Sequence, residues 1–280
     1  MVSYFPTVGV LGSGALVQLL DSPASSLGIN LTKVEDEKNV AGCSVITAVG
    51  DSVSIAQVKT LEKLGALLRA NSSTMEFVKD WNSRIEKDKE NRFSVLVARS
   101  PHGQASAWTP TEAMQGNSFV YSVTPTPNLS AKQMVLAQRL ALDIAKEAET
   151  VGVMEVAIIL RGTDMLVGHL TFGPSTTGVW TIEGSRTSQF EQHLRAILDL
   201  PLGDPSLCAR FTLSAEFRGE RNMYRPYLHL MARSPGLKFH QYPSENAIHS
   251  GHVTALGADL LDLQECISHA VEYMNGVIDE

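Results

Sequence analysis

The opening of the chain constrains its fold more than any other segment. Thr7–Leu11 is a short apolar run rich in β-branched residues, and Gly12-Ser13-Gly14 follows it directly. Residues 15–20 then have a helical pattern. A buried strand, a tight glycine turn and a helix are typical of the first unit of a Rossmann-like parallel sheet.

More elements of the same kind follow. We predict strands over 27–34 and 42–49 and a helix over 55–68. Hydrophobic residues make up 44% of the chain and charged residues 19%, so a sizeable core can be buried. Residues 1–71 are therefore interpreted as a short Rossmann-like N-terminal domain.

The composition changes over residues 72–92. Ten of these residues are charged, while the apolar ones fall on one face at helical spacing. This pattern predicts a helical connector with one solvated side.

The rest of the chain has an α+β pattern. Strands are expected over 93–99, 105–109, 119–123, 153–160, 165–171, 227–231, 238–242 and 252–256. Helices are expected over 130–151, with Ser130 as N-cap and Gly152 just past the end, over 188–198 and over 262–278. Antiparallel strands with helices between them predict a core domain over 93–230, with small strands and a closing helix over 231–280.

Charge and composition exclude several classes of partner. There are 23 Lys and Arg against 30 Asp and Glu, a net charge of −7, and no basic block. This balance argues against nucleic acid and anionic membrane surfaces as partners. No apolar run is long enough to cross a membrane, and residues 1–10 lack the basic start of a secretory signal. Three widely spaced cysteines fit a reducing cytoplasm, where we expect the protein to be located.

The glycine turn is the first candidate site. Gly12, Ser13, Gly14 and Ala15 could form a backbone cradle for phosphate at the start of a helix. A dinucleotide site also needs a small residue where this chain has Val17, although Glu35 or Asp36 could hold a ribose. Dinucleotide binding is therefore the weaker interpretation.

Histidines are the second candidate. His240, His249 and His252 lie in one stretch, whereas His169 and His193 lie elsewhere. We favour surface or hydrogen-bonded histidines over a metal site, because no spacing presents several imidazoles together. No metal is expected.

Longer motifs resemble one enzyme family. The chain resembles the 5-(carboxyamino)imidazole ribonucleotide synthases, ATP-grasp enzymes of purine synthesis that also act as the ATPase subunit of phosphoribosylaminoimidazole carboxylase. The matching segments are 8–14 with Leu16, 96–104 (LVARSPHGQ), 180–184 (WTIEG), 187–203 (TSQFEQHLRAILDLPLG), 235–237 and 250–254. The resemblance implies a trimmed ATP-grasp architecture with a short Rossmann-like N-domain and an ATP-grasp C-terminal half.

Several residues of the chain differ from the family's motifs, and these differences bear on its function as much as the similarities do. The family's lid domain has a Lys and a G-G-Y-D-G-K-G loop, neither of which is found here, so we expect the lid to be absent. The resemblance puts Ala157 and His169 where the family has two magnesium-binding Glu residues. The other changed positions of that motif are Gly168, Gly173, Ser175, Thr176 and Thr177.

The substrate side of the motif is changed too. Ala15 and Gln18 stand where the family has Gln and Arg in its phosphate-binding turn. Glu245 and Ile248-His249 replace cationic residues of a later motif. Replacing cations with neutral or acidic residues removes charge-assisted hydrogen bonds to phosphate.

These changes predict a catalytically degenerate homologue that acts as a binding or scaffolding protein. No ATP, magnesium or other cofactor is expected, and no residue is expected to be catalytic. By resemblance we expect a homodimer, or pairing with an active relative. Two alternatives stay open: dinucleotide binding, and a repurposed enzyme that uses His169, Glu155 and the loop of residues 175–177 in the cleft between the two halves.

Overall fold

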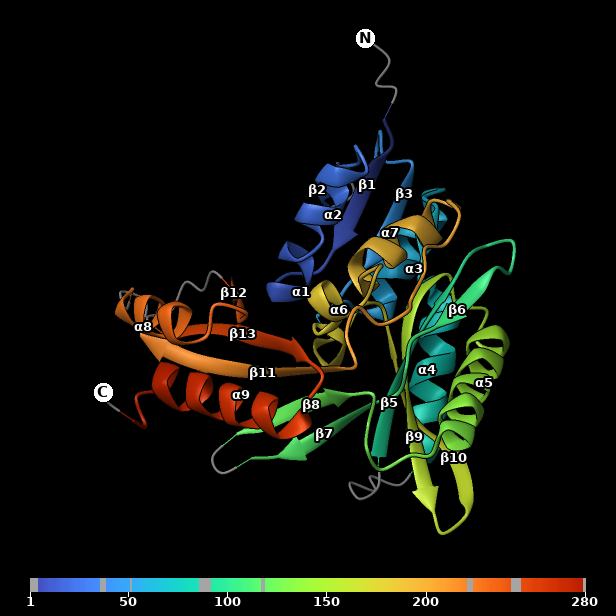
Figure 1. Cartoon of the computed structure of the whole chain (residues 1–280). Helices are drawn as coiled ribbons and strands as arrows, with labels where there is room; N and C mark the ends of the chain where they lie inside the picture. The colour runs from blue at the N-terminus through green and yellow to red at the C-terminus, as the bar shows by residue number, and fades with distance from the viewer. Residues whose placement is uncertain are drawn as a thin grey trace.

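The computed structural model describes residues 5–35, 39–50, 52–85, 92–116, 119–220, 224–242 and 248–278. The N-terminal part is a four-stranded parallel sheet in the order β2-β1-β3-β4 (Figure 1). Its strands are β1 (Thr7–Leu11), β2 (Asn30–Lys33), β3 (Val45–Ala48) and β4 (Leu68–Arg69), and its helices are α1 (Ala15–Gln18), α2 (Asp21–Ser26) and α3 (Ile55–Lys63).

Two helices of this part differ from the prediction. The helix expected over 15–20 ends at Gln18, and α2 begins at Asp21 with Pro23 in its first turn. Proline is tolerated there because its missing N–H has no intrahelical partner. The helix expected over 55–68 ends at Lys63, because Gly65 takes a φ of 84° and stops it. The residues after it form β4, which the sequence did not reveal.

The larger part is a sheet in the order β10-β9-β5-β7-β8-β11-β13-β12, with β6 paired to β5. All its pairings are antiparallel. Its strands are β5 (Arg92–Arg99), β6 (Ala105–Ala107), β7 (Thr111–Gln115), β8 (Val120–Thr124), β9 (Gly152–Arg161), β10 (Asp164–Phe172), β11 (Phe211–Glu220), β12 (Lys238–Tyr242) and β13 (Ile248–Gly257). The helices are α4 (Ser72–Arg84), α5 (Ala131–Glu147), α6 (Thr181–Gly184), α7 (Gln189–Ile197), α8 (Arg225–Arg233) and α9 (Leu260–Met274), with a 3-10 turn at Thr176–Gly178.

Several sequence predictions for this part are wrong. β7 and β11 were missed, and the strand expected over 227–231 is helix α8, in which Tyr227 and Leu230 are buried at helical spacing. Gly152 does not follow α5, because Glu149 takes the positive φ after that helix. Gly152 instead begins β9, where a Cβ atom would lie 2.8 Å from the ring of His193. β11 precedes and β13 follows residue 230, where the sequence predicted a boundary. Because these two strands pair, the large sheet includes residues from both sides of that boundary.

Helix α4 is more than a solvated connector. Its Trp81 indole donates a hydrogen bond to the Gly168 carbonyl at 2.8 Å, and the Asn82 amide exchanges two hydrogen bonds with the Leu170 backbone. Both partners lie on β10, so α4 is fixed to the edge of the large sheet. Residues 86–91 of the expected connector lie outside the described part of the chain.

Helix α7 joins the two sheets (Figure 1). Phe190, Leu194 and Ile197 pack with β1, β3 and α2 of the parallel part. On the other side, His193 contacts β9. The segment that most resembles the synthases therefore encodes the joint between the two sheets.

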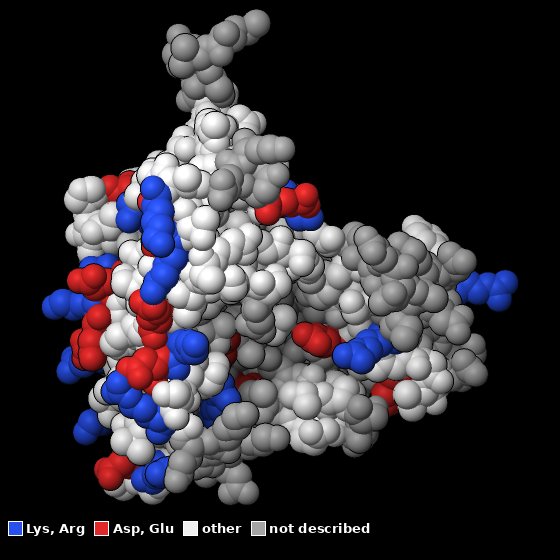
Figure 2. Space-filling model, turned by 180° about the vertical axis from the view of Figure 1, so that it is seen from behind, with Lys and Arg blue, Asp and Glu red and all other residues white. Residues whose placement is uncertain are grey.

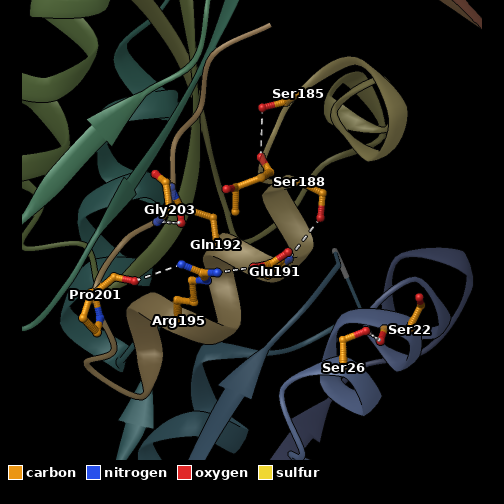
Figure 3. A network of polar contacts seen from close by, with 10 residues as sticks. Ser22, Ser26, Ser185, Ser188, Glu191, Gln192, Arg195, Pro201 and Gly203 are labelled. Atoms are coloured by element: carbon orange, nitrogen blue, oxygen red, sulfur yellow. Dashed lines mark hydrogen bonds and ion pairs between the residues drawn. The ribbon is translucent and has the colours of Figure 1, made fainter. Parts of the chain in front are cut away.

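Glutamines of α7 hold two loops in place. The Gln192 amide accepts a hydrogen bond from Gly203 N at 2.7 Å and donates one to Gly203 O at 2.9 Å (Figure 3). Ser188 caps the helix by accepting from Glu191 N, and Arg195 bridges Glu191 and the Pro201 carbonyl (Figure 3). These contacts fix the chain before and after α7.

Charges of both signs mix on the surface. Figure 2 shows Lys and Arg interspersed with Asp and Glu over the side that holds α4 and α5. Among the described residues, no helix is long and apolar enough to cross a membrane.

Candidate ligand-binding site

A cavity of about 400 Å³ opens on one face of the large sheet. Side chains alternate along β11, so Leu213, Ala215 and Phe217 enter the core under α9 while Ser214 and Glu216 lie on the opposite face. The 3-10 turn closes the cavity from the other side. The lining residues are Ala113, Val120, Ser122, Thr176, Thr177, Val179, Ser214, Ala215, Glu216, Arg218 and Asn275.

A chain of polar side chains leads from this cavity into the sheet. Thr177 lies 2.9 Å from the Ser175 hydroxyl and 3.5 Å from the Ser94 hydroxyl. Ser94 in turn donates a hydrogen bond of 2.7 Å to Glu155, whose side chain is buried on β9. The structure thus brings together Glu155 and the 175–177 loop, two of the three groups that the sequence suggested for altered chemistry.

The third group, His169, is exposed on β10. In the register of the two strands, Thr171 rather than His169 lies opposite Glu155. A break in the register between Val167 and Leu170 separates the two parts of this pairing. The register therefore makes Thr171, and not His169, the direct cross-strand neighbour of Glu155.

The two magnesium positions implied by the resemblance lie on adjacent strands. Ala157 is fully buried on β9, and His169 is on β10. Gly168 has little room for a side chain, because a Cβ atom there would lie 2.9 Å from Ile159. Alanine supplies no ligand atom, so the described residues at these positions do not fit a magnesium site of carboxylates.

The changed loop positions have structural roles. Gly173 has a φ of 76°, and a Cβ atom there would lie 3.2 Å from the Ala48 carbonyl on β3. The Gln189 amide of α7 exchanges two hydrogen bonds with the Ser175 backbone, at 3.0 and 2.7 Å. The loop that borders the cavity is therefore held by α7 and by the end of the parallel sheet.

Close packing accounts for the first glycine of the Gly12–Ala15 turn. Gly12 has a φ of 121°, and a Cβ atom would lie 2.1 Å from the Val49 carbonyl. Gly14 has open space around it, and the helix that follows is a single turn. Glu35 forms an ion pair with Lys33 at 2.6 Å, which lowers the pKa of Glu35. Asp36, the other expected ribose ligand, lies outside the described residues.

His193 is a fully buried link between the two sheets. The Val153 N–H donates to its Nδ1 at 3.1 Å, so Nε2 carries the proton and donates to the Thr47 hydroxyl at 2.8 Å. Burial lowers the pKa of His193 to about 3. The ring is therefore neutral, as the preference for hydrogen-bonded histidines predicts.

Two of the clustered histidines do meet. His240 on β12 and His252 on β13 are direct cross-strand partners, and Glu183 of α6 lies 2.7 Å from His240 Nε2. Burial, followed by the charge of His240, lowers the pKa of His252 to about 3. Sequence spacing could not reveal this meeting, because it depends on the strand register. Glu245 and the side chains of Ile248 and His249 lie outside the described part.

Comparisons with known proteins agree on one family. A family model of the ATP-grasp domain matches residues 72–190. The N5-carboxyaminoimidazole ribonucleotide synthase of Mycobacterium tuberculosis (strain ATCC 25618 / H37Rv) is 38% identical over 201 residues, which is 67% of this chain and 46% of that protein. The synthase of Bacillus subtilis (strain 168) is 32% identical over 156 residues, 55% of this chain and 38% of that protein.

Solved structures share the fold. The crystal structure of N5-carboxyaminoimidazole ribonucleotide synthetase from Thermotoga maritima has a TM-score of 0.80 at 20% identity, covering 95% of this chain and 98% of that one. The phosphoribosylaminoimidazole carboxylase ATPase subunit from Aquifex aeolicus has a TM-score of 0.76 at 19% identity, with 96% and 99% covered. The chain spans less than half the length of the curated relatives named above. Family model, relatives and fold together place the chain in the ATP-grasp family, as a relative of the N5-carboxyaminoimidazole ribonucleotide synthases.

Proposed function

We propose that this protein binds a small polar ligand in the sheet-face cavity and does not perform the ATP-dependent reaction of its relatives. The observation that carries the proposal is Ala157. It is fully buried at the position where the resemblance requires a metal-binding carboxylate. Phosphoryl transfer depends on metal ions and cations that spread the charge of the transferred group.

The nearby carboxylate does not replace the lost ligand. Glu155 lies two residues before Ala157 on the same strand face, but its Oε1 accepts a hydrogen bond from Ser94 and its side chain is buried. Magnesium prefers several oxygen ligands and retained waters in octahedral geometry. The described residues here offer one engaged carboxylate next to hydroxyls, so we derive no step through magnesium.

The connection between the two sheets supports the same proposal. Residues 85–91 alone connect α4 to β5. This segment is too short to fold into a domain that closes over a nucleotide. We infer that the lid of the ATP-grasp enzymes is absent from this position in the chain.

The cavity suits a small molecule with an anionic group. Its volume lies at the lower end of the range for ligand pockets, about 300–1,000 Å³. Ser122, Ser214 and Thr177 supply hydroxyls, while Arg218 supplies a guanidinium and Glu216 a carboxylate. Guanidinium groups bind carboxylate and phosphate oxygens through paired hydrogen bonds. We expect the ligand to be anionic and polar.

An activity assay tests the catalytic half of the proposal. Phosphate release is measured with ATP, magnesium, bicarbonate and aminoimidazole ribonucleotide. We expect no ribonucleotide-dependent release above a blank without protein. A rate within about tenfold of a relative assayed in parallel, a loss of less than 1.4 kcal/mol of transition-state stabilisation, would overturn it.

A binding assay tests the other half. ATP, NAD and aminoimidazole ribonucleotide are added separately, and the melting temperature is recorded, because a ligand of the native state raises it by mass action. We expect the ribonucleotide to raise it and Arg218→Ala to abolish the shift. Arg139→Ala, an exposed change on α5, is the matched control and keeps it. A shift that survives Arg218→Ala would place the ligand outside this cavity.

A further inference from the structure

Three potential metal ligands converge beside the cavity. His240 and His252 extend from the same face of β12 and β13, and Glu183 of α6 lies over them. One ligand atom from each of the three lies within 4.8 Å of the others. The two imidazole rings stack with centroids 4.7 Å apart and an interplanar angle of 11°.

Two buried polar atoms in this cluster lack a hydrogen-bond partner. They are His252 Nε2 and Glu183 Oε2. His252 is fully buried, and the Glu183 side chain is 17% exposed. Leaving buried polar atoms unpaired is costly, and such an atom in a folded protein often marks the place of an ion or a water. Both orphaned atoms belong to residues of one cluster.

Tyr242 orients the buried imidazole. Its hydroxyl forms a hydrogen bond with His252 Nδ1. A phenol is protonated at neutral pH, so this hydroxyl is uncharged. A neutral phenol can accept from Nδ1–H, which leaves the lone pair of Nε2 free. Metal-binding histidines usually have such a partner on the second ring nitrogen.

We propose that Glu183, His240 and His252 form a binding site for one Zn²⁺ ion. Imidazole nitrogen and carboxylate oxygen suit zinc, and three protein ligands leave the fourth position to water or a ligand. The ion would replace the proton shared by His240 and Glu183 and would pair with both orphaned atoms. This site departs from the expectation of no metal and does not depend on the proposed function.

The geometry requires only a small rearrangement. Ligand atoms of a tetrahedral zinc site with bonds of about 2.0 Å lie roughly 3.3 Å apart. Glu183 and His240 are 17% and 28% exposed, so their side chains have room to move while His252 stays fixed. Glu216, the cross-strand neighbour of His252, lines the cavity. The zinc site therefore adjoins the cavity, and its acidic neighbour adds a field that favours a cation.

Metal titration of the whole chain tests this site. The protein is freed of metal with a chelator and titrated with Zn²⁺ by calorimetry, and with Co²⁺ by visible absorption. The variants are Glu183→Gln, His240→Ala and Tyr242→Phe. His102→Ala, which removes an exposed histidine, is the matched control. Circular dichroism confirms that each variant is folded.

We expect one equivalent of Zn²⁺ and intense cobalt bands of four-coordinate geometry. Glu183→Gln and His240→Ala each weaken zinc binding at least about tenfold, and Tyr242→Phe weakens it by a smaller factor. His102→Ala leaves binding unchanged. Absence of a stoichiometric zinc isotherm, or one that the folded Glu183→Gln and His240→Ala variants leave intact, would overturn the proposal. The titration contains no ribonucleotide, so its failure is distinguishable from failure of the proposed function.

Discussion

At the scale of single residues, positions that look functional in the sequence have packing roles. The Gly12 position is closed by the Val49 carbonyl, and Gly173 packs on the Ala48 carbonyl. Both glycines lie where the parallel sheet meets its neighbours. The close approach of the backbone is a sufficient reason for glycine at these two positions.

Gly12 and Gly14 form a matched pair for a stability test. Both have positive φ values, 121° and 92°, so alanine strains the backbone at either position by about 1–3 kcal/mol. Only Gly12→Ala also forces a Cβ atom against a carbonyl oxygen. We expect its free energy of unfolding to fall by at least about 2 kcal/mol more than that of Gly14→Ala. Urea denaturation measures both, and equal losses would contradict the packing explanation.

The buried histidines predict a pH dependence of stability. Burial lowers the pKa of His193 and of His252 to about 3, whereas the unfolded chain binds these protons near pH 6.5. Between these values the unfolded state holds more protons, so stability is full above pH 6.5 and is lost as the pH falls towards 3. At pH 5 the loss is about 2 kcal/mol for each histidine.

Urea denaturation at pH 7.5, 6 and 5 checks this dependence. His193→Gln should flatten the decline by removing one of the two groups, while His102→Ala, at an exposed position, should not. A free energy of unfolding that stays constant from pH 7.5 to 5 would show that the buried rings take up protons in the native state as readily as in the unfolded chain.

At the scale of elements, helix α7 organises the molecule. Three of its polar residues hold separate partners: Gln189 the Ser175 loop, Gln192 the Gly203 loop, and His193 both sheets. These contacts give a structural reason why the sequence of this segment resembles that of the synthases, although the residues at the family's metal-binding positions differ. The helix therefore holds the two halves of the fold together.

Replacing one glutamine tests this role. Gln192→Ala leaves Gly203 N and O without their amide partner in a buried setting, which costs about 2–3 kcal/mol. Glu191→Ala, at the neighbouring residue of the same helix, removes a partly exposed ion pair within one helix and costs less than about 1 kcal/mol. Thermal denaturation compares the two. Similar losses would mean that the amide does not hold the loop.

At the scale of the whole molecule, the two halves meet through α7 and the ends of β3 and β10. The expected dimer stays a prediction. Most residues of α7 are buried within the chain, whereas Asp199, Leu200 and Pro201 just after it are exposed. Light scattering at micromolar concentration measures the mass directly against 30.4 kDa for one chain.

Restoring the two carboxylates should not restore the enzyme. In the double variant Ala157→Glu and His169→Glu, one new carboxylate enters a fully buried position beside Glu155. Like charges without a metal repel, and positioning and electrostatics act as a unit in phosphoryl transfer. We expect ATP turnover to stay at background and the melting temperature to fall, with partial recovery in magnesium. Ribonucleotide-dependent ATP turnover would show that a nucleotide site survives.

The sequence by itself determined the local elements and the family. Alternating apolar residues and the Ser130 cap predicted most strands and helices, because these signals act within a few residues. Strands β4 and β7 are too short to show a clear period. The sequence prediction also missed the alternation along β11 and assigned the residues of α8 to a strand.

Tertiary structure alone decided the sites. Ser94 meets both Glu155 and Thr177, and Glu183 meets His240 and His252, only through strand register and the placement of two short helical turns. Ser94 and Thr177 are 83 residues apart in the sequence, and Glu183 and His240 are 57 residues apart. Register is fixed by the packing of whole sheet faces, because a slip of one residue would turn every side chain to the other face.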